Sequence, residues 1–271
     1  MESILFGSLA IILYLLTSAA LTLRLTRGEA GAHIKRTSVL LLGFGAMALH
    51  AAVLYPHLVT VKGLDLGFFN AASLTALLMV LVLLLAAVRQ PVENLGILLL
   101  PIAAATVALA IINPGNGLVV ASGSWQLDLH ILFSVLAYSV LALAALQAVL
   151  LAVQDRQLRN RHPGGFIRAL PPLEAMERLL FQMIASGFVL LSAALLTGIL
   201  FLEDIFAQHL VHKTILSIIA WFVFGILLWG RWRFGWRGRT AIRWTMAGVT
   251  FLVLAYFGTK LVLELILHRA A

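Results

Sequence analysis

The sequence predicts an all-α polytopic membrane protein, a helix bundle of about eight transmembrane helices, on three observations. Hydrophobic residues make up 62% of the 271 residues and charged residues only 11%, whereas globular domains average about 45–50% and about 25%. Several apolar runs reach the roughly 18 residues that a spanning helix needs. Lysine and arginine gather in the connections between these runs. A soluble fold could not cover so apolar a chain with polar surface.

Each apolar run is long enough for one span. Because lipid offers the backbone no hydrogen-bond partners, helices are favoured over strands, and the runs lack the alternation of a membrane barrel. At about 20 residues each, the spans use most of the chain, so residues 1–271 are expected to form a single transmembrane domain. The predicted spans are 4–23, 38–54, 68–88, 95–112, 129–153, 181–201, 214–232 and 244–267.

Basic residues set the predicted orientation, because cytoplasmic loops carry an excess of Lys and Arg. Of the 19 basic residues, only Lys62, Lys213, Lys260 and Arg269 lie outside four connections, which are therefore assigned to the cytoplasm. Both termini are then predicted to lie outside. Tryptophans and arginines of residues 229–244 are expected to anchor the chain to membrane lipids. A net charge of +8 spread over separate loops does not make a nucleic-acid-binding face. The four connections are 24–37, 89–94, 154–180 and 231–243.

Segment 154–180 is the one sizeable cytoplasmic excursion. Residues 163–165 (PGG) break any helix, and Pro171 and Pro172 can start a new one. Apolar residues then recur at helical spacing, which predicts an interfacial helix leading into the sixth span. A docking site for a cytoplasmic partner is the alternative.

Six of the eight histidines fall in the outer half of the membrane in this topology. Ionisable groups at membrane depth are costly and usually functional, and a neutral imidazole binds haem iron or a transition metal well. For each one, the structural alternative is an interfacial or hydrogen-bonded histidine. A zinc site with His209, His212 and Glu203 or Asp204 is a further alternative. The six are His50, His57, His130, His209, His212 and His268.

The last predicted helix carries Lys260, Glu264 and His268, one every four residues and hence on one face. Lys260 and Glu264 can neutralise each other as a structural ion pair, which lowers the cost of keeping both in the bilayer. Alternatively they line a polar cavity, together with Asn70 and Ser73 at the start of the third span. These last two residues could equally bridge helices.

Several chemistries are excluded. The chain has no cysteine, so it can form neither disulfides, thiolate nucleophiles, Cys-ligated metal centres nor thioether-linked haem. It contains no phosphate-binding or dinucleotide-binding glycine motif, no His-Glu-x-x-His and no Gly-x-Ser-x-Gly. Soluble-enzyme chemistry therefore has no support.

Several short stretches together resemble the cytochrome c assembly family, which includes the CcsA/ResC-type haem-handling proteins and a smaller YpjD/HemX-like inner-membrane branch. The resemblance covers most of residues 125–260, and the overall length and loop pattern are closest to the smaller branch. The stretches are 124–130 (SWQLDLH), 134–138 (SVLAY), 212–214 (HKT), 220–224 (AWFVF), 235–239 (GWRGR) and 255–258 (AYFG).

This resemblance implies a multi-pass protein of the bacterial inner membrane that binds or passes haem (haem b) on its outer side. Its expected role is to assist cytochrome c maturation or haem handling, with cytochrome c maturation proteins as partners. His130 falls where a family histidine is expected, and His268 lies near the position of another. His130 and His212 are the favoured ligands, followed by His50, with Trp125 as a further haem contact.

One feature of the larger relatives, a Trp-x-Trp-Asp-Pro segment, is missing, and residues 203–214 stand in its place. Haem lyase activity is therefore not expected. Two other functions stay open. One is a membrane adaptor or regulator of haem-pathway or other partner proteins, without haem transfer, acting through 154–180 and 231–243. The other is a small-molecule or metal-ion transporter using the face of Lys260 and Glu264, although no inverted repeat is evident.

Overall fold

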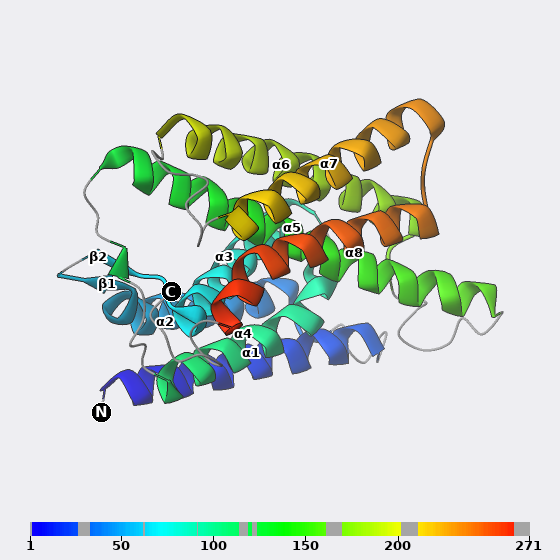
Figure 1. Cartoon of the computed structure of the whole chain (residues 1–271). Helices are drawn as coiled ribbons and strands as arrows, with labels where there is room; N and C mark the ends of the chain where they lie inside the picture. The colour runs from blue at the N-terminus through cyan, green and yellow to red at the C-terminus, as the bar shows by residue number, and fades with distance from the viewer. Residues whose placement is uncertain are drawn as a thin grey trace. The chain divides into compact units, whose positions relative to one another are not determined.

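Eight long helices, each apolar enough to cross a membrane, are found in the described part of the chain (Figure 1). The computed structural model describes residues 2–26, 33–61, 63–90, 92–113, 119–120, 124–160, 170–201 and 211–262. The helices are α1 (Glu2–Thr26), α2 (Arg36–Leu58), α3 (Phe68–Arg89), α4 (Gly96–Ile112), α5 (Trp125–Arg159), α6 (Leu173–Phe201), α7 (Val211–Phe234) and α8 (Arg239–Val253).

Short helical turns and strands accompany the long helices. A 3-10 turn (Glu93–Leu95) leads into α4, and a π-helix (Leu254–Gly258) continues α8. The strands are β1 (Val59–Thr60), β2 (Gly63–Asp65) and β3 (Val119–Val120). β2 and β3 pair antiparallel, with Leu64 opposite Val120 and Asp65 opposite Val119.

The eight predicted spans and the all-α class are confirmed, while the outside location of the termini stays a prediction. α5 has 35 residues and, at about 1.5 Å per residue, is longer than a hydrocarbon core of about 30 Å. Residues 173–180, predicted as an interfacial helix leading into the sixth span, form the first turns of α6. No helix breaker separates them from the sixth span, and the burial of Met176 and Leu180 continues the buried face of α6.

The described helices belong to two compact units. In the first, α1 packs against α2 and α4, and in the second α7 packs against α8. The absence of a side chain at Gly248 allows the second contact, because a Cβ there would lie 2.6 Å from the ring of Phe224. The single domain over residues 1–271 stays a prediction. The first unit comprises Met1–Val61, Phe69–Gly115 and Val153–Leu173, and the second Lys62–Phe68, Asn116–Ala152 and Glu174–Ala271.

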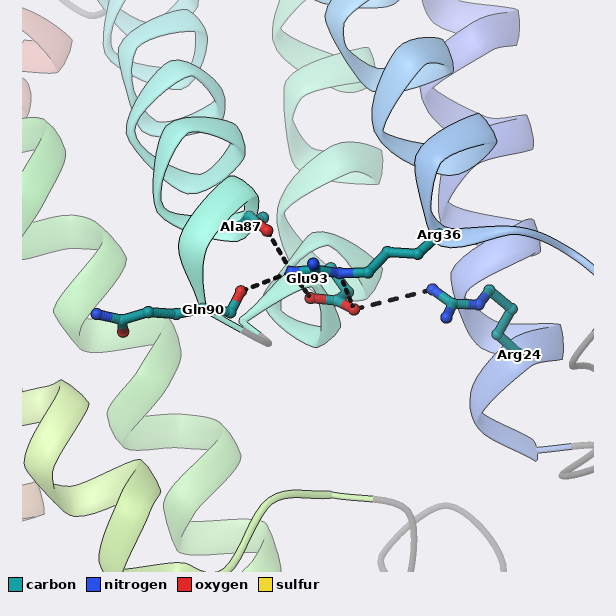
Figure 2. Close-up of polar contacts among 5 residues, drawn as sticks. All are labelled: Arg24, Arg36, Ala87, Gln90 and Glu93. Carbon is teal, nitrogen blue, oxygen red and sulfur yellow. Dashed lines mark hydrogen bonds and ion pairs between the residues drawn. The ribbon is translucent and has the colours of Figure 1, made fainter.

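An arginine–carboxylate cluster joins the helix ends of the first unit (Figure 2). The Arg36 guanidinium donates to both Glu93 carboxylate oxygens, at 3.0 and 3.3 Å. It also donates to the carbonyls of Ala87 and Gln90 at the end of α3. Arg24 at the end of α1 lies 3.8 Å from the same carboxylate. One carboxylate thus ties α1 and α2 together, and Arg36 adds the last carbonyls of α3.

Replacing Glu93 with glutamine is expected to destabilise the protein by about 1–2 kcal/mol, because two arginines lose their counter-charge while the site is still partly solvated. The thermal midpoint of the purified protein in detergent measures this loss. The exposed Glu174 at the start of α6 supplies the control variant Glu174→Gln, which should leave the midpoint unchanged. Equal midpoints for the two variants would contradict a stabilising role for the cluster.

Candidate functional site

The second unit contains a cavity of about 250 Å³ between α5, α6, α7 and the π-helix, closed on one side by Leu66. Leu, Ile and Val side chains form much of its apolar wall, and Gly198, Ala194 and Ala255 leave the room for it. The polar residues that line it are His130, Ser134 and Tyr138 on α5, Lys213, Thr214 and Ser217 on α7, and Tyr256 in the π-helix.

His130 is held in one orientation by α6. Its Nδ1 lies 2.9 Å from the carbonyl oxygen of Ala194, with the Thr197 hydroxyl at 3.4 Å. A carbonyl only accepts hydrogen bonds, so Nδ1 carries the hydrogen, and the neutral ring keeps its lone pair on Nε2. Among the described residues, no hydrogen-bond partner is found for Nε2. His130 therefore brings an oriented electron-pair donor to the cavity.

The two cavity tyrosines are bound to the backbone. The Tyr138 hydroxyl donates to the carbonyl of Leu252, next to the π-helix. A side chain inserted into the backbone ladder is a known cause of irregular turns in helices, and π-helical turns often occur at functional sites. The Tyr256 hydroxyl donates to the carbonyl of Leu66 at 3.1 Å. Both hydroxyls thus hold the cavity wall.

Lys260 is buried, 3% exposed, and its Nζ also donates to the Leu66 carbonyl. It also lies 5.2 Å from the ring centroid of Tyr256. Lys260 does not itself line the cavity, but its hydrogen bond holds Leu66, which does. Its predicted partner Glu264 and the predicted ligand His268 both lie outside the described residues.

His50 and Asn70 are buried polar residues of the first unit, in separate hydrogen-bonded groups. His50 Nδ1 lies 3.1 Å from the Tyr14 hydroxyl and Nε2 lies 2.8 Å from the Ser73 hydroxyl. All three side chains are almost fully buried. Asn70 donates to the carbonyl of His57 at 3.3 Å, and its buried Oδ1 has no partner in the described part of the chain. His50, with both ring nitrogens engaged, connects α1, α2 and α3.

His212 and Trp125 lie near the cavity but do not line it. His212 is exposed at the second residue of α7, directly before the cavity-lining Lys213 and Thr214. Trp125 is 64% exposed at the start of α5 and packs on Phe201 at the end of α6, with ring centroids 5.8 Å apart. The second unit therefore places four of the resembling stretches, 124–130, 134–138, 212–214 and 255–258, at or beside one cavity.

No group of three or more metal-binding side chains occurs among the described residues. Of the proposed zinc set, His209, Glu203 and Asp204 lie outside them, as do residues 161–169 of the proposed docking segment. Sequence reasoning missed Ser217 and Leu66. It included Ser134, Tyr138 and Tyr256 only as members of the resembling stretches 134–138 and 255–258, without assigning them to the site. For α7, the spacing of Lys213, Thr214 and Ser217 on one helical face could have indicated a polar lining, because these residues interrupt an otherwise apolar run.

The family model described as "Cytochrome C assembly protein" matches residues 38–267. "Inner membrane protein YpjD" of Escherichia coli strain K12 is 34% identical over 267 residues, covering 96% of this chain and 98% of the relative. An "Uncharacterized 28.8 kDa protein in nifR3-like 5'region" of Azospirillum brasilense is 36% identical over 149 residues, covering 54% and 55%.

A more distant relative is "Cytochrome c biogenesis protein CcsA" of Synechococcus sp. strain CC9311. It is 26% identical over 178 residues, which cover 55% of this chain and 58% of the relative. No solved structure gives a significant match.

Proposed function

Because this chain belongs to the cytochrome c assembly protein family and is a multi-pass inner-membrane protein, we propose that it binds haem in the cavity of its second unit. His130 is the proposed ligand, and unmodified iron protoporphyrin (haem b) the proposed cofactor. The role we propose is to assist cytochrome c maturation or haem handling on the outer side of the membrane.

The hydrogen bond between His130 Nδ1 and the Ala194 carbonyl carries this proposal. Histidines that ligate metals almost always donate their other ring N–H to a carbonyl, carboxylate or water, which fixes the tautomer and the ring orientation. The arrangement at His130 meets that requirement with Nε2 as the coordinating atom. His50 differs, since both its ring nitrogens are hydrogen-bonded.

The chemical character of the residues that line the cavity suits haem. The cavity offers one oriented imidazole, and its α6 wall is wholly apolar, which suits a flat macrocycle. Its volume of about 250 Å³ is below the roughly 300–1,000 Å³ of typical ligand pockets. A ligand as large as haem is then only partly enclosed, which suits a protein that passes it on.

Each protein group has a defined task in this proposal. When bound, haem supplies an iron centre able to accept a lone pair. His130 provides that lone pair, Ala194 holds the opposite ring nitrogen, and the apolar side chains exclude water. His212, exposed one residue before the cavity wall, is the proposed second ligand. The chain lacks cysteine, so no thioether bond forms between haem and this chain.

Titrating purified protein with haem tests the proposal. A saturable Soret band, shifted from that of haem in detergent alone, is expected in the wild-type protein. Detergent micelles without protein and heat-unfolded protein are the blanks. A wild-type spectrum identical to these blanks would refute haem binding by this chain.

A further inference from the structure

A short segment of the second unit closes one side of the cavity. Residues 63–67, here called the strap, comprise β2 and the two residues before α3. The Leu66 side chain lines the cavity and is only 7% exposed. Leu64 and Asp65 of the strap pair with β3. Because a ladder between two strands is marginally stable by itself, so short a pairing holds the strap only weakly.

Two donors from the last helical segment hold one backbone oxygen of the strap. The Tyr256 hydroxyl donates to the Leu66 carbonyl at 3.1 Å, and the Lys260 ammonium group donates to the same carbonyl. The Lys260 nitrogen also lies 5.2 Å from the Tyr256 ring centroid, within reach of a cation–π interaction. A single donor satisfies a backbone carbonyl. The second donor is a buried lysine, and ionisable groups at membrane depth are costly and usually functional.

The two ends of the strap are held differently. Gly63, at its start, has a φ of 135°, a conformation that glycine adopts much more readily than other residues. Phe68, directly after the strap, packs edge-on against Phe257 of the π-helix, with ring centroids 5.7 Å apart. Between them, the Gly67 N–H donates to the Asp65 carboxylate at 2.9 Å, which stiffens the turn. Hinges are a few residues at element ends that absorb changes in φ and ψ, and Gly63 meets that description.

We propose that the strap is a gate of the cavity and that Tyr256 and Lys260 form the latch that keeps it closed. Breaking the hydrogen bonds at the Leu66 carbonyl frees the strap to move about Gly63, which withdraws the Leu66 side chain from the cavity wall. A ligand then enters or leaves on that side. The inference rests on the proposed function for the identity of that ligand, an iron porphyrin. Lys260 is a positioning residue, since it acts through Leu66 and does not line the cavity.

Thiol labelling measures the opening of the gate without any ligand. The chain has no cysteine, so Leu66→Cys introduces a single thiol. A bulky maleimide, too large for a cavity of about 250 Å³, reaches this thiol only when the strap opens. Adding Lys260→Met to the full chain in phosphatidylcholine nanodiscs is expected to raise the labelling rate at least about tenfold, the scale of one hydrogen bond to a charged group. Tyr256→Phe removes a neutral hydrogen bond and should raise it about fivefold.

Two controls separate gating from general loosening of the fold. The exposed Lys35 supplies Lys35→Met, which should leave the labelling of Leu66→Cys unchanged. Ala241 is fully buried near the start of α8, so Ala241→Cys should label slowly with or without Lys260→Met. Equal labelling rates of Leu66→Cys with and without Lys260→Met, or equal acceleration at both cysteines, would overturn the gate.

Haem kinetics in the cysteine-free protein then test control of access. Lys260→Met is expected to raise the association and dissociation rates by the same factor, about tenfold, and to leave the Kd unchanged, because a gate acts on both directions. A weaker Kd with an unchanged association rate would instead give Lys260 a purely structural role and overturn the latch. Failure of haem binding is a distinct result. Accelerated labelling in a protein that shows no Soret shift refutes only the haem proposal, and normal haem binding with unchanged labelling refutes only the gate.

Discussion

Replacing His130 with alanine is expected to weaken haem binding at least about a hundredfold. Loss of a group that merely orients a metal ligand costs about 10–100-fold, and loss of the ligand itself should cost no less. The substitution removes the Nε2 lone pair and leaves the Ala194 carbonyl with its helical partners. Soret absorbance during haem titration measures the affinity.

Two other histidines serve as comparisons in the same titration. His33 is exposed in the first unit, so His33→Ala should bind haem as wild type does. His212→Ala tests the second ligand, and a changed Soret position with retained binding is expected if His212 completes the iron coordination. Wild-type affinity and spectrum in His130→Ala would remove His130 from the site.

The membrane fold could be predicted from the sequence because its signal is local. Each span is a run of apolar residues, and a backbone in lipid must satisfy its hydrogen bonds within the run. The ends of α5 and α6 were less predictable. The apolar run marks only the part of a helix that suits lipid. α5 continues beyond its apolar run through Asp155 and Arg159, whose side chains pair at 3.1 Å, and α6 begins at Leu173, before its apolar run.

The candidate site was only partly predictable for a different reason. His130 could be singled out as a rare polar residue in an apolar span, supported by the family resemblance. Its partner is the backbone of Ala194, and a backbone carbonyl carries no sequence signature. The π-helix at Leu254–Gly258 likewise has no sequence signature, and Tyr138 bonds the Leu252 carbonyl just before it from another helix. Chain order does not fix helix neighbours, so the sequence alone could not separate His50 from His130.

Replacing His50 with leucine is expected to destabilise the first unit by about 2–4 kcal/mol and to leave haem binding intact. The substitution leaves the hydroxyls of Tyr14 and Ser73 unpaired in a buried site. Each unpaired group costs about 1–3 kcal/mol, and interhelical hydrogen bonds in membranes contribute about 0.6–2 kcal/mol. Thermal unfolding of the full chain in detergent measures the loss, and haem titration of the same sample tests ligation.

A triple variant separates the hydrogen bonds from the packing. Tyr14→Phe, His50→Leu and Ser73→Ala together remove all three polar groups, and replacing every partner by apolar groups can be nearly neutral. Most of the lost stability should therefore return in the triple variant. If His50 were a haem ligand, both variants would lose the Soret band, and the single variant would lose little stability. The two roles make opposite demands on the imidazole, because a nitrogen that accepts or donates a hydrogen bond within the bundle has no lone pair to offer iron. The stability and the spectrum of one protein sample therefore decide between them.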